Sequence, residues 1–407
     1  MSASMWIRLS IMMLLQYWIW GAWGAYLPVY LRELEFGALQ IGAIMSMLYF
    51  ASMFAPIVGG QITDRYLSSE KFLGIMQLLG GVFLFIMAEQ TEFFPFIFFM
   101  FLWAVVYSPT LPITNIMCFR NLTDVEREFG WIRFWGTIGW ILSGWALTAW
   151  LYYSPDGENC LRLAAVASII MGFFSFILPS TPPKKEGGHP LAFVEAFSLL
   201  KRPSFLAFMV ISFVVATELM FYYVLTSPFL EDIGTPTNDI PAWMTLAQIA
   251  EIISLLVLLP LILPRVSIKT AMLIGILAWP VRYVIFAIGD PWWLVIASLP
   301  LHGLCYVFFF VVGQIYVDKV APESIRSSAQ SLLFFVTFGL GLTSGSYFAG
   351  WIQWLFTDAN DVVNWTGVFL VPVFLTILCA IGFIIFFKEP KEDPDKPVEQ
   401  GDLPEVA

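Results

Sequence analysis

The sequence predicts an all-α membrane protein with twelve transmembrane helices in two six-helix pseudo-repeat halves. Of its 407 residues, 59% are hydrophobic and only 12% are charged, and the mean hydropathy is +0.80. Soluble domains are about 45–50% apolar and about 25% charged. Long apolar runs recur along the whole chain, and at about 20 residues per span they leave room for about twelve helices. These runs are too long for the roughly 10-residue strands of a membrane barrel, so only helices satisfy the backbone in lipid.

The first apolar run is too long for the core of a cleavable signal peptide, so it is the first predicted span. The runs predict spans at residues 6–30, 38–62, 71–89, 94–117, 131–153, 161–179, 204–229, 241–263, 268–287, 291–317, 325–353 and 364–387.

The positive charges predict that both termini are cytoplasmic. With the N-terminus inside, only Arg32 and Arg162 fall outside, while Arg133 and Arg282 lie at or within helices. This asymmetry is the signal by which short loops are assigned to the cytoplasm. The predicted inner residues are Arg8, Arg65, Lys71, Arg120, Arg127, Lys184, Lys185, Lys201, Arg202, Arg265, Lys269, Lys319, Arg326, Lys388, Lys391 and Lys396.

A long cytoplasmic loop divides the chain into domains. We predict an N-terminal half at 1–180, a linker at 181–203, a C-terminal half at 204–388 and a disordered acidic tail at 389–407. Within the linker, Leu191–Leu200 predicts an amphipathic helix with Phe193, Phe197 and Leu200 on one face.

Several function classes are excluded. The net charge of −10 argues against nucleic-acid binding, which needs clustered Lys and Arg. No P-loop, G-x-S-x-G or H-E-x-x-H motif is present, so we expect neither ATP-driven transport nor an enzyme. The four cysteines lack metal-ligand spacing and are predicted to be buried small side chains. No cofactor and no metal is implied.

Ionisable residues at bilayer depth are costly, so each needs a partner or a water-filled cavity. In span 5, Arg133, Thr137 and Trp140 share one helical face and suit a polar, ring-bearing solute. In span 8, Gln248 and Glu251 share a face and suit sugar hydroxyls or a base edge. The alternative is an Arg133–Glu251 ion pair that holds the halves together without touching a solute.

Other polar side chains leave similar alternatives. Gln16, Trp20 and Trp23 form one stripe of span 1, which either lines a cavity or, for the tryptophans, anchors in the lipid interface. Glu218 and Arg282 are predicted to pair within the C-terminal half. His302 is interpreted as a packing histidine, although its usual pKa allows it to titrate near neutral pH.

Pro109 and Pro112 predict a bend in span 4, and Pro280 predicts a kink in span 9 beside Arg282. Broken helices are tolerated where they line a cavity. Together with two six-helix halves, this favours a transporter with its site between the halves.

The chain resembles the bacterial nucleoside:proton symporters of the major facilitator superfamily. Gly60-Gln-Ile-Thr-Asp64-Arg65 is similar to the superfamily's loop motif between its second and third helices. Further similar segments, in order, are Gln16–Gly21, Asp64–Ser68, Tyr107–Leu111, Ile132–Gly139, Gln248–Glu251, Ala278–Arg282 with Gly289-Asp290, and Ile325–Gln330.

The resemblance implies a major facilitator fold in a bacterial inner (cytoplasmic) membrane, with a central cavity whose nucleoside contacts include Arg133, Thr137, Trp140, Gln248 and Glu251. It also implies that Gly60, Asp64 and Arg65 serve conformational gating. The partners implied are a nucleoside-like small molecule, protons and the lipid bilayer, with no nucleic acid, and we expect a monomer.

Two departures from the family pattern alter the predicted pocket. Met220 and Tyr223 stand where the family has a glutamine and an asparagine, and Tyr306-Val307 stands where it has Phe-Asp. Fewer hydrogen-bonding groups predict a nucleoside held by stacking, or a more apolar solute. The predicted substrate-binding set is Arg133, Thr137, Trp140, Met220, Tyr223, Gln248, Glu251, Tyr306, Phe310, Gln16 and Trp20.

With valine at position 307, Glu251 becomes the leading proton carrier and Glu218 the reserve. We therefore predict a secondary active transporter that imports nucleosides by proton symport with alternating access. A transporter of another solute, such as a sugar or glycoside, with or without proton coupling, is the alternative. A membrane sensor without transport activity, or a membrane-embedded enzyme, is the more distant alternative.

Overall fold

The computed structural model describes residues 2–55, 62–63, 66–183 and 192–389. These residues are almost entirely helical, and eight helices among them are by themselves long and apolar enough to cross a membrane. The remaining predicted spans are also helical in the described parts. The predicted gating residues Gly60, Asp64 and Arg65, and the tail from residue 390, lie outside the described residues.

Two spans of the N-terminal half are each broken into two helices. The break after α1 lies just before Pro28, and the break after α6 lies at Pro109, which confirms the predicted bend of span 4. Proline fits the first turn of a helix because its missing N–H has no partner there. The helices are α1 (Ala3–Gly24), α2 (Leu27–Glu33), α3 (Ala38–Ser52), α5 (Ser69–Ala88), α6 (Phe93–Tyr107), α7 (Thr110–Asn121), α8 (Val125–Leu151) and α9 (Asn159–Ser175).

Four spans of the C-terminal half contain a wide, π-helical turn: η2 (Phe221–Leu225), η4 (Ser254–Leu258), η6 (Tyr306–Val311) and η8 (Phe335–Gly341). Such turns are rare and frequently occur at functional sites. By contrast, α15 (Ile268–Ile288) continues as a single helix through Pro280.

The other helical segments of this half are α10 (Pro203–Met220), α11 (Thr226–Asp232), η3 (Thr237–Asp239), α12 (Ile240–Met244), α13 (Leu246–Ile253), α14 (Leu259–Ile262), η5 (Leu263–Arg265), α16 (Trp292–Ser298), α17 (Leu301–Cys305), α18 (Val312–Val320), η7 (Glu323–Ile325), α19 (Arg326–Phe334), α20 (Leu342–Leu355) and α21 (Trp365–Phe386).

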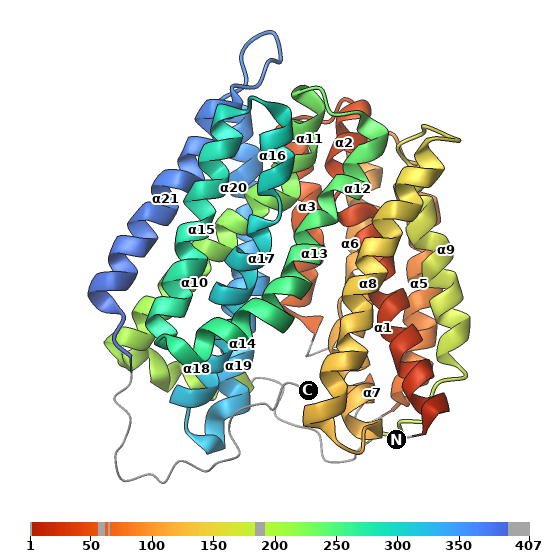
Figure 1. The fold of residues 1–407 in the computed structure, drawn as a ribbon. Helices are drawn as coiled ribbons and strands as arrows, with labels where there is room; N and C mark the ends of the chain where they lie inside the picture. Colours follow the sequence, from red (N-terminus) through yellow and green to blue (C-terminus); the bar gives the residue numbers. More distant parts are fainter. Residues whose placement is uncertain (1, 56–61, 64–65, 184–191, 390–407) are drawn as a thin grey trace.

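The two halves lie side by side (Figure 1). We call the end where α1 begins and α21 ends the terminal end, and the end that carries α2, α11 and α12 the distal end. The halves pack through α3 against α20 and through α8 against α12 and α13. At the first of these crossings a Cβ on Gly42 would lie 2.6 Å from the carbonyl oxygen of Ser346, and one on Gly350 would meet the carbonyl of Ala38. Only glycine permits this approach.

Polar contacts tie the halves together at the distal end. The Arg32 guanidinium lies 2.8 Å from a carboxylate oxygen of Asp232 and 3.4 Å from one of Glu231. Next to them, the Tyr152 hydroxyl donates to Asp239 at 2.8 Å. At the terminal end, Ser204 and Lys388 bond to each other within the C-terminal half. The structure thus has its distal end closed.

The linker segment differs from its prediction. η1 (Ala192–Lys201) is a 3₁₀ helix that packs against α19. Its buried face carries Ala196 and Leu199, whereas Phe197, predicted on that face, is 44% exposed. A 3₁₀ helix repeats every three residues, so residues three apart share a face and the α-helical spacing used for the prediction is wrong.

The four cysteines are all free and buried, as predicted from their apolar surroundings: Cys118, Cys160, Cys305 and Cys379.

Candidate functional site

The predicted face of span 5 lies on one unbroken helix. The helix α8 begins after Asp124, whose carboxylate accepts from the backbone N–H of Arg127 at 3.2 Å. One side of α8 carries Arg133 and Thr137, both half-buried, and the buried Trp140. The guanidinium carbon of Arg133 lies 3.9 Å from the centre of the Tyr17 ring, a cation–π contact with α1. Span 5 therefore presents a cation, a hydroxyl and an aromatic ring together.

Aromatic rings from both halves meet beside this face. The Trp20 ring lies 5.1 Å from Trp140 of its own half and 6.0 Å from Phe338 of the other. A second connection runs from Trp140 to Tyr223 at 6.3 Å. We call this group the central aromatic cluster; its members are Tyr17, Trp20, Tyr49, Trp140, Tyr223 and Phe338. Offset and edge-on rings of this kind accept a further flat ring with little rearrangement.

The predicted face of span 8 lies on α13. Gln248 is 6% exposed and its side-chain oxygen has no hydrogen-bond partner. Buried polar atoms are nearly always hydrogen-bonded, so a free amide oxygen marks a place for a ligand or water. Glu251, one turn on, is half-buried. Arg133 acts electrostatically on Glu251, and both act on Tyr306 of η6.

The structure does not form the ion pair considered for span 5 and span 8. Among the described residues, Arg133 and Glu251 make no direct salt bridge, and Arg133 is held instead by the face of Tyr17. Arg133 and Glu251 lie on α8 and α13, two helices that pack against each other across the halves.

Arg282 lies in a cage of aromatic rings rather than in the predicted pair with Glu218. Its guanidinium carbon is 4.7 Å from the centres of the Tyr222 and Trp279 rings and 4.9 Å from that of Tyr283. No salt bridge to Glu218 is formed within the described chain. The carboxylate of Glu218 instead accepts from the Thr376 hydroxyl at 2.5 Å. The prediction was wrong because the two side chains project toward different neighbouring helices.

His302 links this cage to the candidate site. Its Nδ1 lies 3.2 Å from a guanidinium nitrogen of Arg282, and its ring stacks on Tyr222 at 4.6 Å and on Tyr306 at 6.0 Å. Its Nε2 has no partner. His302 is buried as predicted for a packing histidine, and it also makes a polar contact that the sequence did not indicate.

Three predicted residues point away from the central aromatic cluster. The Gln16 amide donates to Thr110 at 2.8 Å and accepts from Gln77 at 2.9 Å, inside the N-terminal half. Met220 is buried against Gly345 of α20. Trp23 is only 1% exposed and lies edge-on to Trp103 at 5.2 Å, so it does not anchor in lipid. We leave Gln16 and Met220 out of the proposed site.

Tyr17, Tyr49 and Phe338 were not predicted as site residues from the sequence. The chain has 39 phenylalanines and 14 tyrosines, so the residue type alone carries no signal. The one usable signal was the spacing of Tyr17 and Trp20, which places both on one side of α1.

Comparison with known proteins identifies the family and the fold of the chain. The chain matches the model of the nucleoside H+ symporter family over residues 1–392. It is 34% identical to YegT of Escherichia coli (strain K12), covering 94% of this chain and 93% of YegT. It is 29% identical to the nucleoside permease NupG of the same organism, covering 94% and 96% of the two chains.

The crystal structure of the nucleoside transporter NupG superimposes with a TM-score of 0.86 at 28% identity, covering 95% of this chain and all of that one. The POT family transporter PepTSo superimposes with a TM-score of 0.74 at 14% identity, which shows a shared fold alone. These likenesses confirm the predicted major facilitator fold of twelve membrane-spanning helices in two halves. The family and the relatives are transporters, and the chain belongs to the nucleoside:proton symporter family.

Proposed function

We propose that this protein imports nucleosides together with protons by rocking its two halves around the central aromatic cluster. The observation that carries the proposal is that the cluster draws rings from both halves and lies beside Arg133 and Glu251, one from each half. A solute bound there would contact both halves at once, which alternating access requires. The relatives include NupG, a nucleoside permease, and a xanthosine permease, both of Escherichia coli.

Different side chains bind different parts of the nucleoside. The base stacks on the aromatic rings, with Trp140 on one half and Tyr223 on the other. The free oxygen of Gln248 accepts from an N–H or hydroxyl of the solute. Tyr306 and Phe310, whose rings lie 5.4 Å apart, close the C-terminal side.

Glu251 is the proposed proton carrier. It is a half-buried carboxyl at the site, and Arg133 is the charged group that acts on it from the other half. Protonation of Glu251 would remove that attraction and loosen the contact between halves. Glu218 is the reserve candidate, since one of its oxygens has no partner although the other is bound by Thr376.

We propose that the terminal end faces the cytoplasm of a bacterium, as the distribution of positive charges predicts. The closed distal end would then face outward, and the structure would represent the inward-facing state. A monomer in the inner membrane remains our expectation.

The test is uptake of labelled uridine and adenosine into proteoliposomes, with and without an inward proton gradient. We expect gradient-stimulated uptake by the wild type. Glu251→Gln should abolish accumulation yet retain exchange of internal for external nucleoside, because the variant still binds solute but carries no proton. Glu92→Gln, an exposed glutamate at the start of α6, is the matched control and should behave as the wild type.

Accumulation retained by Glu251→Gln would assign the proton to another residue. Uptake without any response to the gradient would identify an uncoupled facilitator. Absence of uptake of either compound by folded protein would overturn nucleosides as the solute.

A further inference from the structure

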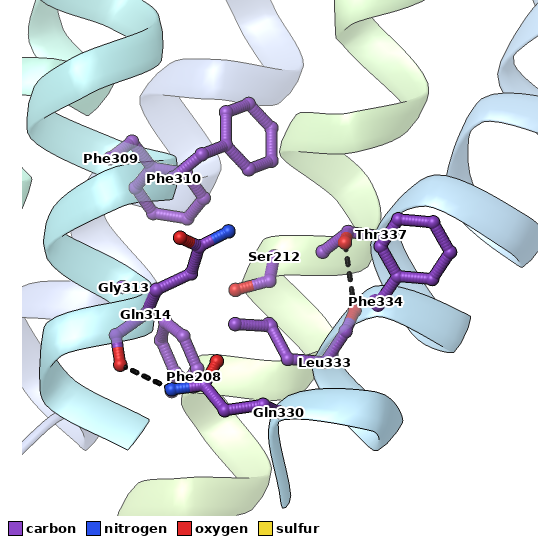
Figure 2. A pocket seen from close by; sticks show the side chains of 10 residues that line it. All are labelled: Phe208, Ser212, Phe309, Phe310, Gly313, Gln314, Gln330, Leu333, Phe334 and Thr337. Atoms are coloured by element: carbon purple, nitrogen blue, oxygen red, sulfur yellow. Dashed lines mark hydrogen bonds between the residues drawn. The ribbon is translucent and has the colours of Figure 1, made fainter. Parts of the chain in front are cut away.

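A second pocket opens within the C-terminal half, between α10, η6, α18, α19 and η8 (Figure 2). It holds about 360 Å³, counting the part that is open to solvent. Among the described residues, its walls are aromatic rings, uncharged polar groups and Leu333. The lining residues are Phe208, Ser212, Phe309, Phe310, Gly313, Gln314, Gln330, Leu333, Phe334 and Thr337.

The polar groups of this pocket are arranged for a ligand. The Ser212 side chain is buried, its hydroxyl has no hydrogen-bond partner, and Figure 2 shows it directed into the pocket. A buried hydroxyl without a partner loses the free energy of its lost hydration, unless a ligand or water supplies the bond. The Gln314 amide points toward the same space, and Gln330 is fixed nearby by donating to the Gln314 carbonyl at 2.8 Å.

The pocket adjoins the central site through two aromatic contacts. Phe310 lines the pocket and lies 5.4 Å from Tyr306. Phe334, on the opposite wall, stacks at 4.7 Å on Phe338 of the central aromatic cluster. Gln314 and Gln330 lie on α18 and α19, which Figure 1 places at the terminal end. The pocket therefore lies between the central site and the terminal end.

We propose that this pocket is a second binding site for the heterocyclic base of a nucleoside, occupied as the solute passes between the central site and the terminal end. The flat rings of Phe310 and Phe334 offer stacking surfaces, and the hydroxyl and two amides match the donors and acceptors of a base edge. The cavity proper is about 50 Å³, below the roughly 300 Å³ of pockets that enclose a whole ligand, so the pocket takes one edge of the base and leaves the sugar toward solvent. This inference rests on the proposed function.

The experiment measures protection of a cysteine in the pocket from alkylation. The four native cysteines are first replaced by alanine, so that only the introduced cysteine reacts. In Leu333→Cys, which lies on the pocket wall and leaves its polar groups in place, we expect uridine at millimolar concentration to slow alkylation at least 5-fold. Ser331→Cys, exposed on the same helix and outside the pocket, is the control and should react at one rate with and without uridine.

Two further variants separate local occupancy from effects of the central site. Adding Ser212→Leu, which fills the pocket, should remove the protection. Adding Trp140→Ala and Tyr223→Ala, which remove the two rings proposed to stack on the base in the central site, should preserve it. Loss of protection in that last background would overturn the inference, since the effect would then be transmitted from the central site.

The outcome also distinguishes this inference from the proposed function. Wild-type protein that takes up uridine while Leu333→Cys is unprotected overturns the second site alone. Wild-type protein that takes up neither nucleoside overturns the proposed function and the second site with it.

Discussion

In the N-terminal half, the buried amide of Gln16 is bound by two neighbours, Thr110 and Gln77. In the C-terminal half, the buried amide of Gln248 leaves its oxygen without a partner. The same contrast appears in the helices, since the described N-terminal spans break cleanly at prolines whereas four C-terminal spans contain wide turns. The Gln16 amide of the N-terminal half is thus satisfied within its own half, and the Gln248 amide of the C-terminal half has bonding capacity left for a solute.

This difference indicates which half responds to the solute. A buried hydrogen-bond network makes its surroundings rigid when every polar group in it is bonded. A network with an unbonded polar group gains stability when a ligand or water supplies the missing hydrogen bond. The wide turns carry Tyr223, Tyr306, Phe310 and Phe338. We therefore expect solute binding to reorder the C-terminal half against a fixed N-terminal frame.

The largest effect should follow from Gln16→Leu, which breaks the satisfied network. The Gln77 amide would keep only its longer bond to Thr110 at 3.3 Å, and Thr110 would lose the Gln16 donor while still donating to the Tyr107 carbonyl. Two lost bonds at about 0.5–1.5 kcal/mol each lower the expected free energy of unfolding by about 1–3 kcal/mol, visible as a lower melting temperature of the purified protein. Gln90→Leu, an exposed glutamine bound only to the Ile86 carbonyl, is the control. Equal melting temperatures for the two variants would show that Gln16 does not stabilise the N-terminal half.

Gln248→Leu makes the same change in the other half and should give the opposite result. Its oxygen has no protein partner to lose, so we expect the melting temperature to stay close to that of the wild type. Nucleoside affinity should fall about 10-fold, since one hydrogen bond to the solute is worth about 1–1.5 kcal/mol. Equilibrium binding of labelled uridine measures this. A large loss of stability with unchanged affinity would abolish the distinction between the two halves.

The smallest expected effect is a pH dependence at the distal end, where the halves meet outside the spans. Burial of the Glu33 carboxyl raises its pKa to about 7. The nearby negative charges of Glu231, Glu158 and Asp156 each contribute a smaller part of this rise. Because the pKa of Glu33 is raised in the closed state, the protonated carboxyl favours closure. This contribution is complete below about pH 4.5, the usual pKa of the group, and is lost as the pH rises through 7. The Glu33 side chain still reaches solvent, so the effect should be modest.

Spin labels at Glu35 and Asn238, one on each half, would report the opening. We expect the distance distribution of the wild type to shift toward longer values between pH 5 and pH 8. Glu33→Gln carries no titrating group and should show one distribution at both values. A shift of equal size in this variant would assign the pH dependence to another residue.

The sequence predicted the helices well and the site in part, for a physical reason. Apolar length and periodicity are local properties, so the twelve spans and the shared faces of Arg133 with Trp140 and of Gln248 with Glu251 followed from spacing. Gln16 and Gln248 look alike in sequence, because each is a lone amide in an apolar helix. Only the fold shows that Gln77, from another span, reaches Gln16 and that no residue reaches the oxygen of Gln248.

The remaining errors arose from distant contacts. Glu218 and Arg282 were paired by charge, yet one faces Thr376 and the other lies among aromatic rings. The wide turns were not predicted, because each is confined to a single stretch of its span and leaves the apolar composition and length of the span unchanged. Phe338 joins the central aromatic cluster only because η8 widens where α20 begins.

The glycine crossing of α3 and α20 limits how the protein moves. No side chain separates the two backbones at Gly42 and Gly350, so the helices α3 and α20 are in direct contact there. Close packing along this line favours rotation of one half over the other rather than separation of the halves. Opening one end then obliges the other to close, so the motion is reduced to a single angle. This coupling of the two ends keeps the proton gradient intact, because a carrier open at both ends would let protons flow across the membrane without transporting solute.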